Sequence, residues 1–183
     1  MSFLKLTIAE DAISKKTESY KNIQAMLGAL IVSVSVAIFS GFWYFLVSHD
    51  INWNASQVVL VLHLTAGGIS LLVIGVYFIL HQKDKEQRWW LFLAPWKIKL
   101  QSDETEQHLR QRWLGAILTW LFIAIYTSGL LIAIPGLLFY FNIIWMQDYY
   151  FFQQLDFIHI GASLVVFPVL LLHLLWVARK QGL

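Results

Sequence analysis

Apolar residues dominate four long segments of this chain, and polar residues gather between these segments and at the two ends. Each segment exceeds the roughly 20 residues that a helix needs to cross the hydrocarbon core of a bilayer. The pattern therefore predicts four membrane-spanning helices. They are expected at about 23–48, 57–80, 113–141 and 155–178.

The connections between these segments are too short to hold a separate domain. We therefore expect an all-α fold in which residues 1–183 form a single membrane domain, an integral membrane four-helix bundle. The longest connection is 82–112, and its middle reads RWWLFLAPWKIKL. Aromatic and basic side chains favour the head-group level, so this stretch is expected to lie along the inner membrane surface.

Basic residues predict the orientation of the helices. All 13 Lys and Arg residues lie before the first apolar segment, within 82–112 or at the C-terminus. Cytoplasmic loops accumulate Lys and Arg, so both termini are expected in the cytoplasm, and the connections 48–56 and 142–154 outside. Residues 1–22 are polar, so no cleavable signal peptide is expected there.

Composition limits the chemistry open to the chain. It is 58% hydrophobic and 13% charged, with a mean hydropathy of +0.64. The net charge of +2 reflects topology and gives no indication of nucleic-acid binding. The absence of cysteine excludes disulfides, cysteine zinc sites, thiolate-bound iron–sulfur clusters and c-type haem attachment. Histidine is left as the obvious strong metal ligand.

Four of the six histidines fall on the second and fourth predicted helices or, in the case of His81, directly at the end of one. His63 and His159 each lie about 6–9 Å in from the outer end, so they are level with one another. His81 and His173 lie on the same helical faces, about 27 Å and 21 Å deeper. The other two are expected to be solvated or at the membrane surface. They are His49 and His108.

Histidines in register on two parallel helices are what a b-type cytochrome requires. Imidazoles from facing helices ligate a haem iron from both sides, and neutral imidazole brings no charge into the lipid. Gly67 and Gly68 lie close to His63 and would let a flat macrocycle lie against the helix. The alternative is that the histidines only form hydrogen bonds between helices. Intramembrane ionisable residues are usually functional, which favours the haem interpretation.

The two halves of the chain resemble each other. The first predicted helix reads GALIVSVSVAIFSG where the third reads GAILTWLFIAIYTSG, and LHLTAG in the second corresponds to IHIGAS in the fourth. This alignment gives His63 and His159 corresponding positions. Such similarity is also typical of the small residues that let membrane helices approach closely.

With these residues in place, the sequence resembles the bacterial cytochrome b561 family of four-helix membrane haem proteins. LHLTAGGISLLVIGVYFIL resembles the family's second helix, LGAILTWLFIAIYTSGL its third, and IHIGASLVVFPVLLLH its fourth, with two histidines 14 residues apart. The resemblance implies that His63 and His159 ligate one haem b. It also implies that His173 and a histidine from the first helix ligate a second haem.

The first helix departs from the family pattern because it has no histidine. It reads KNIQAML, with Gln24 at or near the expected position and Met26 close by. Three arrangements are open for His173. The second haem is absent, it is held by His173 and His81 despite a depth difference of about 6 Å, or it has a His173/Met26 ligand pair. We rank His81 slightly first, because tilt can absorb much of the difference.

The sequence therefore predicts a bacterial inner-membrane cytochrome that holds one or two haems b. It would transfer electrons between quinone and a redox protein partner, either alone or as the membrane subunit of a respiratory oxidoreductase. Lipid contacts and a homo- or hetero-oligomer are expected. A haem-free scaffold or assembly subunit is the first alternative. A small proton-linked transporter is the second, although such proteins generally have carboxylates or broken helices within the membrane.

Overall fold

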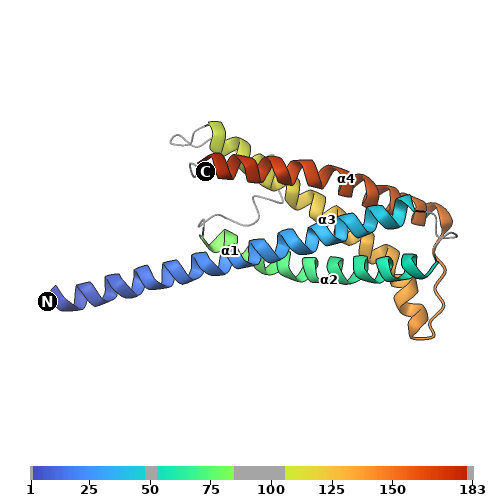
Figure 1. Ribbon diagram of the computed structural model, residues 1–183, viewed down its shortest axis with the longest axis horizontal. Helices are drawn as coiled ribbons and strands as arrows, with labels where there is room; N and C mark the ends of the chain where they lie inside the picture. The colour runs from blue at the N-terminus through green and yellow to red at the C-terminus, as the bar shows by residue number, and fades with distance from the viewer. Residues whose placement is uncertain (1, 48–52, 85–105, 181–183) are drawn as a thin grey trace. The chain divides into compact units, whose positions relative to one another are not determined.

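The computed structural model describes residues 2–47, 53–84 and 106–180 (Figure 1). These residues form four helices joined in sequence, and they contain no strand, which confirms the all-α prediction. The helices are α1 (Ser2–Leu46), α2 (Trp53–Asp84), α3 (Glu106–Tyr140) and α4 (Tyr149–Lys180).

Each helix contains a stretch long and apolar enough to cross a membrane. The stretches are Lys21–Leu46, Trp53–Leu80, Leu109–Tyr140 and Tyr149–Trp176. Large apolar side chains also stay exposed on these helices, as Leu72 (73%) and Phe157 (80%) show. A helix that is apolar on all sides is stable in lipid, so the fold indicates a multi-pass membrane protein.

The predicted helix ends need correction at several points. Helix α1 begins about 20 residues earlier than predicted, because hydropathy locates the membrane and not the end of the helix. The polar residues before Lys21 contain neither Pro nor Gly, and in Figure 1 they continue α1 beyond the end of α2. Helix α4 begins at Tyr149, where a start at 155 was predicted. Asp148 explains this start, because its Oδ1 accepts the Phe151 N–H at 3.1 Å and caps the first turn.

The predicted connection 82–112 is shorter in the structure, since α2 continues to Asp84 and α3 begins at Glu106. The stretch RWWLFLAPWKIKL lies outside the described residues, as does His49.

The chain falls into two compact units, Met1–Glu86 and Gln87–Leu183. Helices α1 and α2 pack together in the first unit, and α3 and α4 pack together in the second. Each unit is thus a helical hairpin with its own packed interface. The predicted single domain stays a prediction.

Small residues form much of the packed interface of the first hairpin. Ser33 and Ser40 of α1 and Ala66 and Ser70 of α2 are all buried, and small side chains let two membrane helices approach closely. The buried hydroxyls bond within their own helices. Ser33 donates to the Leu30 carbonyl at 3.2 Å, so its burial leaves no unsatisfied hydroxyl.

The second hairpin buries both small and large side chains between its helices. Its buried residues include Ala116 and Phe122 on α3 and Leu155 and Val166 on α4. Where the start of α3 meets the end of α4, the Gln111 side chain donates a hydrogen bond to the Trp176 carbonyl at 3.4 Å. Apolar contact and cross-helix hydrogen bonds together hold α4 against α3.

Candidate functional site

The His63 ring lies against α1 in a pocket shaped by a glycine. Its Nδ1 atom is 2.8 Å from the carbonyl oxygen of Ala37. A Cβ atom added to Gly41 would come within 2.8 Å of the ring Cε1 and 2.9 Å of Nδ1. Real Cβ atoms essentially never approach another atom so closely. The half-buried ring therefore occupies the space that the missing side chain of Gly41 leaves.

His159 lies against α3 in the same way. Its Nδ1 is 3.0 Å from the carbonyl oxygen of Ile125. A Cβ atom on Gly129 would come within 2.9 Å of the ring Cε1 and 3.2 Å of Nδ1. The hydroxyl of Ser128 lies 3.2 Å from the same Nδ1, which gives this ring a second polar neighbour on α3.

The two arrangements share the same spacing of residues along α1 and α3. In each hairpin the accepting carbonyl lies four residues before the glycine, and a buried serine directly precedes that glycine. Ser40 and Ser128 each donate to the carbonyl four residues earlier in their own helix at 2.6 Å. We call each arrangement a histidine socket. The first consists of Ala37, Ser40, Gly41 and His63, and the second of Ile125, Ser128, Gly129 and His159.

The socket fixes the tautomer of each histidine. A carbonyl oxygen only accepts hydrogen bonds, so Nδ1 carries the proton in both His63 and His159. In a neutral imidazole with its proton on Nδ1, the lone pair is on Nε2. A backbone carbonyl on one ring nitrogen is a common partner of histidines that bind a metal through the other nitrogen. Both sockets therefore fit the role of a metal-ligating imidazole.

The other two predicted ligands are His173 on α4 and His81 on α2. His173 is a half-buried residue of α4, and its Nδ1 atom is buried. His81 belongs to the last turn of α2, but its side chain lies outside the described residues, as does that of His108 in α3. Pairing of His173 with His81 stays a prediction. On α1, Met26 is half-buried and Gln24 is exposed.

Gly67 and Gly68 have open space beside them. A Cβ atom added to either residue would meet no atom within 4 Å, in contrast to Gly41. Within the first hairpin, these two glycines therefore make no close contact with α1. The open space next to His63 is compatible with the predicted approach of a flat macrocycle.

The four Ser and Gly residues of the sockets were missed by reasoning from the sequence. The signal was nevertheless present, because the aligned segments GALIVSVSVAIFSG and GAILTWLFIAIYTSG both end in Ser-Gly. The alignment predicts corresponding positions for His63 and His159, and its small residues indicate close helix packing, but neither inference assigns a role to the Ser-Gly pairs. Its ends are Ser40-Gly41 and Ser128-Gly129, and of these residues Gly41 lies against the His63 ring while Ser128 and Gly129 lie against the His159 ring.

Each socket offers a single imidazole donor, His63 in the first hairpin and His159 in the second. Among the side chains that the structure describes, no three from His, Cys, Asp and Glu gather closely enough to hold a metal ion. A haem iron has a different requirement, because the porphyrin supplies four nitrogens and the protein adds only one or two axial ligands. One histidine per hairpin meets that requirement.

No protein-family profile, curated protein sequence or solved structure matches the chain. Its function is therefore inferred from the geometry of its own residues.

Proposed function

We propose that this protein is a b-type cytochrome, a membrane protein that binds haem b and passes single electrons between quinone and a redox partner. The observation that carries the proposal is the repeated histidine socket. Two histidines occupy corresponding positions of the two hairpins and have the same tautomer. Each forms a hydrogen bond with a backbone carbonyl of the neighbouring helix, and each contacts the glycine four residues after that carbonyl. Two such imidazoles are suited to hold one haem iron between them.

In the proposed site, Nε2 of His63 and Nε2 of His159 would hold one haem iron. The Ala37 and Ile125 carbonyls orient the two rings, because each Nδ1–H bond limits rotation of its imidazole. Neutral imidazoles bring no net charge into the membrane, which avoids the free-energy penalty of an unpaired buried charge. The haem supplies the one-electron chemistry, and the chain supplies ligation, orientation and exclusion of water.

The proposal also covers the space beside His63, the orientation of the chain in the membrane and a second haem. A Cβ at Gly67 or Gly68 would meet no atom within 4 Å, so these residues of α2 would leave room for a haem. The distribution of basic residues supports cytoplasmic termini, and the resemblance to the bacterial cytochrome b561 family supports a bacterial inner membrane. Electron transfer as the membrane subunit of a respiratory oxidoreductase is part of the proposal. A second haem would be held by His173, with His81 favoured over Met26 as its other ligand.

A haem-free scaffold is the second candidate function. The Nδ1 hydrogen bonds of His63 and His159 also favour this function, because each one joins a helix to its neighbour through a backbone carbonyl. In a scaffold the imidazoles would need no further partner. The two candidates therefore differ in whether the purified chain carries haem.

The test is haem quantification per chain on the purified full-length protein and on His63→Ala and His159→Ala. The proposal expects each substitution to remove the same haem, so the double variant loses no more than either single variant. His108→Ala is the control, since His108 is expected at the surface and should keep the full haem content. If His63→Ala and His159→Ala removed different haems, the pairing would be wrong. A wild-type chain without haem would favour the scaffold.

A further inference from the structure

A proline interrupts the hydrogen bonding of α3 near its C-terminal end. Pro135 lies inside the helix and has no N–H group. In an uninterrupted helix the N–H of residue 135 would donate to the carbonyl of Leu131, four residues earlier. Pro135 therefore deprives the Leu131 carbonyl of its usual donor.

The side chain of Gln147 supplies a donor to that carbonyl. Its Nε2 atom donates to the Leu131 oxygen at 2.9 Å, from 16 residues further along the chain. Gln147 lies in the connection between α3 and α4. The bond thus compensates for the proline and also holds the connection against α3.

Local hydrogen bonds fix both ends of this connection. After α3, Asn142 takes a left-handed conformation with φ of 60°, and Ile143 N–H donates to the Leu138 carbonyl at 3.0 Å. This is the geometry of a Schellman motif, which closes the end of a helix. At the other end Asp148 caps α4. The connection therefore has a defined path.

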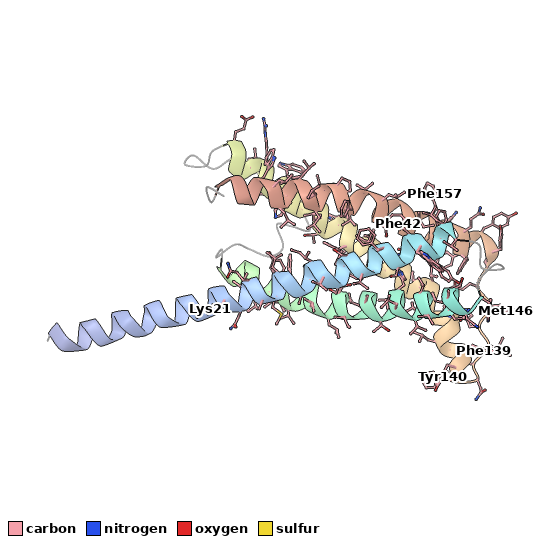
Figure 2. All side chains as sticks on the ribbon, viewed as in Figure 1. Lys21, Phe42, Phe139, Tyr140, Met146 and Phe157 are labelled. Atoms are coloured by element: carbon pink, nitrogen blue, oxygen red, sulfur yellow. The ribbon has the colours of Figure 1, made fainter. Side chains whose placement is uncertain are left out.

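The side chains around this connection are apolar and exposed. Phe139, Tyr140, Ile144 and Met146 have 69%, 83%, 80% and 84% of their surface accessible. Figure 2 shows Phe139, Tyr140 and Met146 projecting outward at the end of α3 and in the connection that follows it. Residues 142–154 contain neither Lys nor Arg. We call Phe139–Met146 the apolar tip.

The backbone of the apolar tip needs a polar environment. Within the described part of the chain, the N–H groups of Ile144, Trp145 and Met146 have no backbone acceptor. Unbonded N–H groups are unfavourable in the hydrocarbon core, whereas exposed Ile, Met and aromatic side chains are unfavourable in water. The head-group level of a bilayer satisfies both requirements, because it offers water to the backbone and apolar contact to the side chains.

We propose that the apolar tip binds the lipid surface at head-group level, and that the Gln147–Leu131 hydrogen bond holds it there. Recognition rests on apolar side chains and not on lipid charge, because the segment has no basic residue. The partner is therefore the interfacial zone of an ordinary zwitterionic bilayer. This inference does not depend on the presence of haem.

A single spin label on the full-length protein tests the position of the tip. The chain has no cysteine, so Met146→Cys gives one labelling site. In phosphatidylcholine vesicles, collision rates with oxygen and with a water-soluble nickel chelate report depth. Leu72→Cys, exposed on α2, is the lipid reference, and Glu106→Cys, whose side chain is 77% exposed, is the polar reference.

We expect a label at position 146 to lose most of its nickel accessibility relative to 106, while oxygen accessibility lies between those of 106 and 72. Anionic lipid should leave these values unchanged. Nickel accessibility as high as at 106 would place the tip in water and overturn the proposal. Protection from both reagents would indicate that a protein partner or a second copy covers the tip, which would also overturn it.

A double-mutant cycle tests the role of Gln147. Gln147→Leu should make the label at 146 more mobile and more accessible to nickel. In a Pro135→Ala background the N–H of residue 135 can donate to Leu131, so Gln147→Leu should have a smaller effect there. The label at 72 checks that each variant is folded and inserted. Equal effects of Gln147→Leu in both backgrounds would contradict the proposed coupling.

Discussion

The Nδ1 atom of His63 is 2.8 Å from the carbonyl oxygen of Ala37, so the imidazole of α2 donates to the backbone of α1. Such a hydrogen bond contributes about 0.5–1.5 kcal/mol to stability. Its larger consequence is orientation, because it fixes the tautomer and limits rotation of the ring. The bond between His159 and Ile125 repeats this relationship in the second hairpin.

Gly41→Ala should displace the His63 ring and lower the haem content of the purified protein. The added Cβ would lie 2.8 Å from Cε1, so the ring or the helix must move. Overpacking of this kind typically destabilises a site by about 1–3 kcal/mol. The measurement is the ratio of haem to protein after purification.

Gly28→Ala on the same helix is the matched control, because a Cβ there meets no atom within 4 Å. It should retain the wild-type haem content. If both alanine variants kept full haem, the close contact at Gly41 would not matter for ligation, and the socket would lose its proposed role.

Ser128→Ala should weaken the second socket without abolishing it. The substitution removes a polar neighbour 3.2 Å from the His159 Nδ1, but the Ile125 carbonyl still accepts from that atom. We expect haem to be retained and the free energy of unfolding to fall by about 0.5–1.5 kcal/mol. Thermal unfolding in detergent and haem content measure the two effects.

Thr119→Ala provides the comparison on the same helix, since its hydroxyl bonds to the Gly115 carbonyl within α3. It should leave the haem spectrum unchanged. Complete haem loss in Ser128→Ala would mean that the serine, and not the Ile125 carbonyl, determines the orientation of His159.

Gly67→Leu should reduce haem binding while leaving the first hairpin folded. A Cβ atom added to Gly67 would meet no atom within 4 Å, so the substitution is expected to leave the packing of α2 against α1 intact. A leucine there would occupy the volume proposed for the macrocycle. Haem content and far-ultraviolet circular dichroism separate the two effects, with Gly28→Leu as a control in another open position. Full haem content in Gly67→Leu would place the macrocycle elsewhere.

Asp148→Ala should destabilise the start of α4 by about 1 kcal/mol, because the Phe151 N–H loses its acceptor. Asp148→Asn keeps an acceptor oxygen and should restore most of this stability. Thermal unfolding of the purified protein measures both. Asp156→Ala is the control, since Asp156 is exposed within α4 and should change little. An equal loss in the alanine and asparagine variants would show that charge matters more than the cap.

The sequence predicts the number and type of the helices because bilayer thickness imposes a simple requirement on apolar length. It locates their ends less well. The polar start of α1 is helical although it lies outside any apolar segment, and α4 starts at Tyr149, directly after its cap Asp148, because capping and not hydropathy determines that boundary. Both errors arise because hydrophobicity and helix formation are separate properties.

The two candidate haem ligands could be predicted from residue type and not from hydropathy. His63 and His159 stand out because ionisable side chains in apolar helices are rare. Their sockets were not predictable, since the contacts at Gly41 and Gly129 join residues more than 20 positions apart. Only the packing of each hairpin shows that these glycines make room for an imidazole.

The most direct test of the account is a reduced-minus-oxidised absorption spectrum of the purified wild-type protein. If the two histidine sockets ligate haem, the spectrum shows the bands of a b-type cytochrome with two imidazole ligands, and His159→Ala abolishes the contribution of that haem. A spectrum without b-type bands, from protein that is folded and purified with haem supplied during expression, would contradict the account.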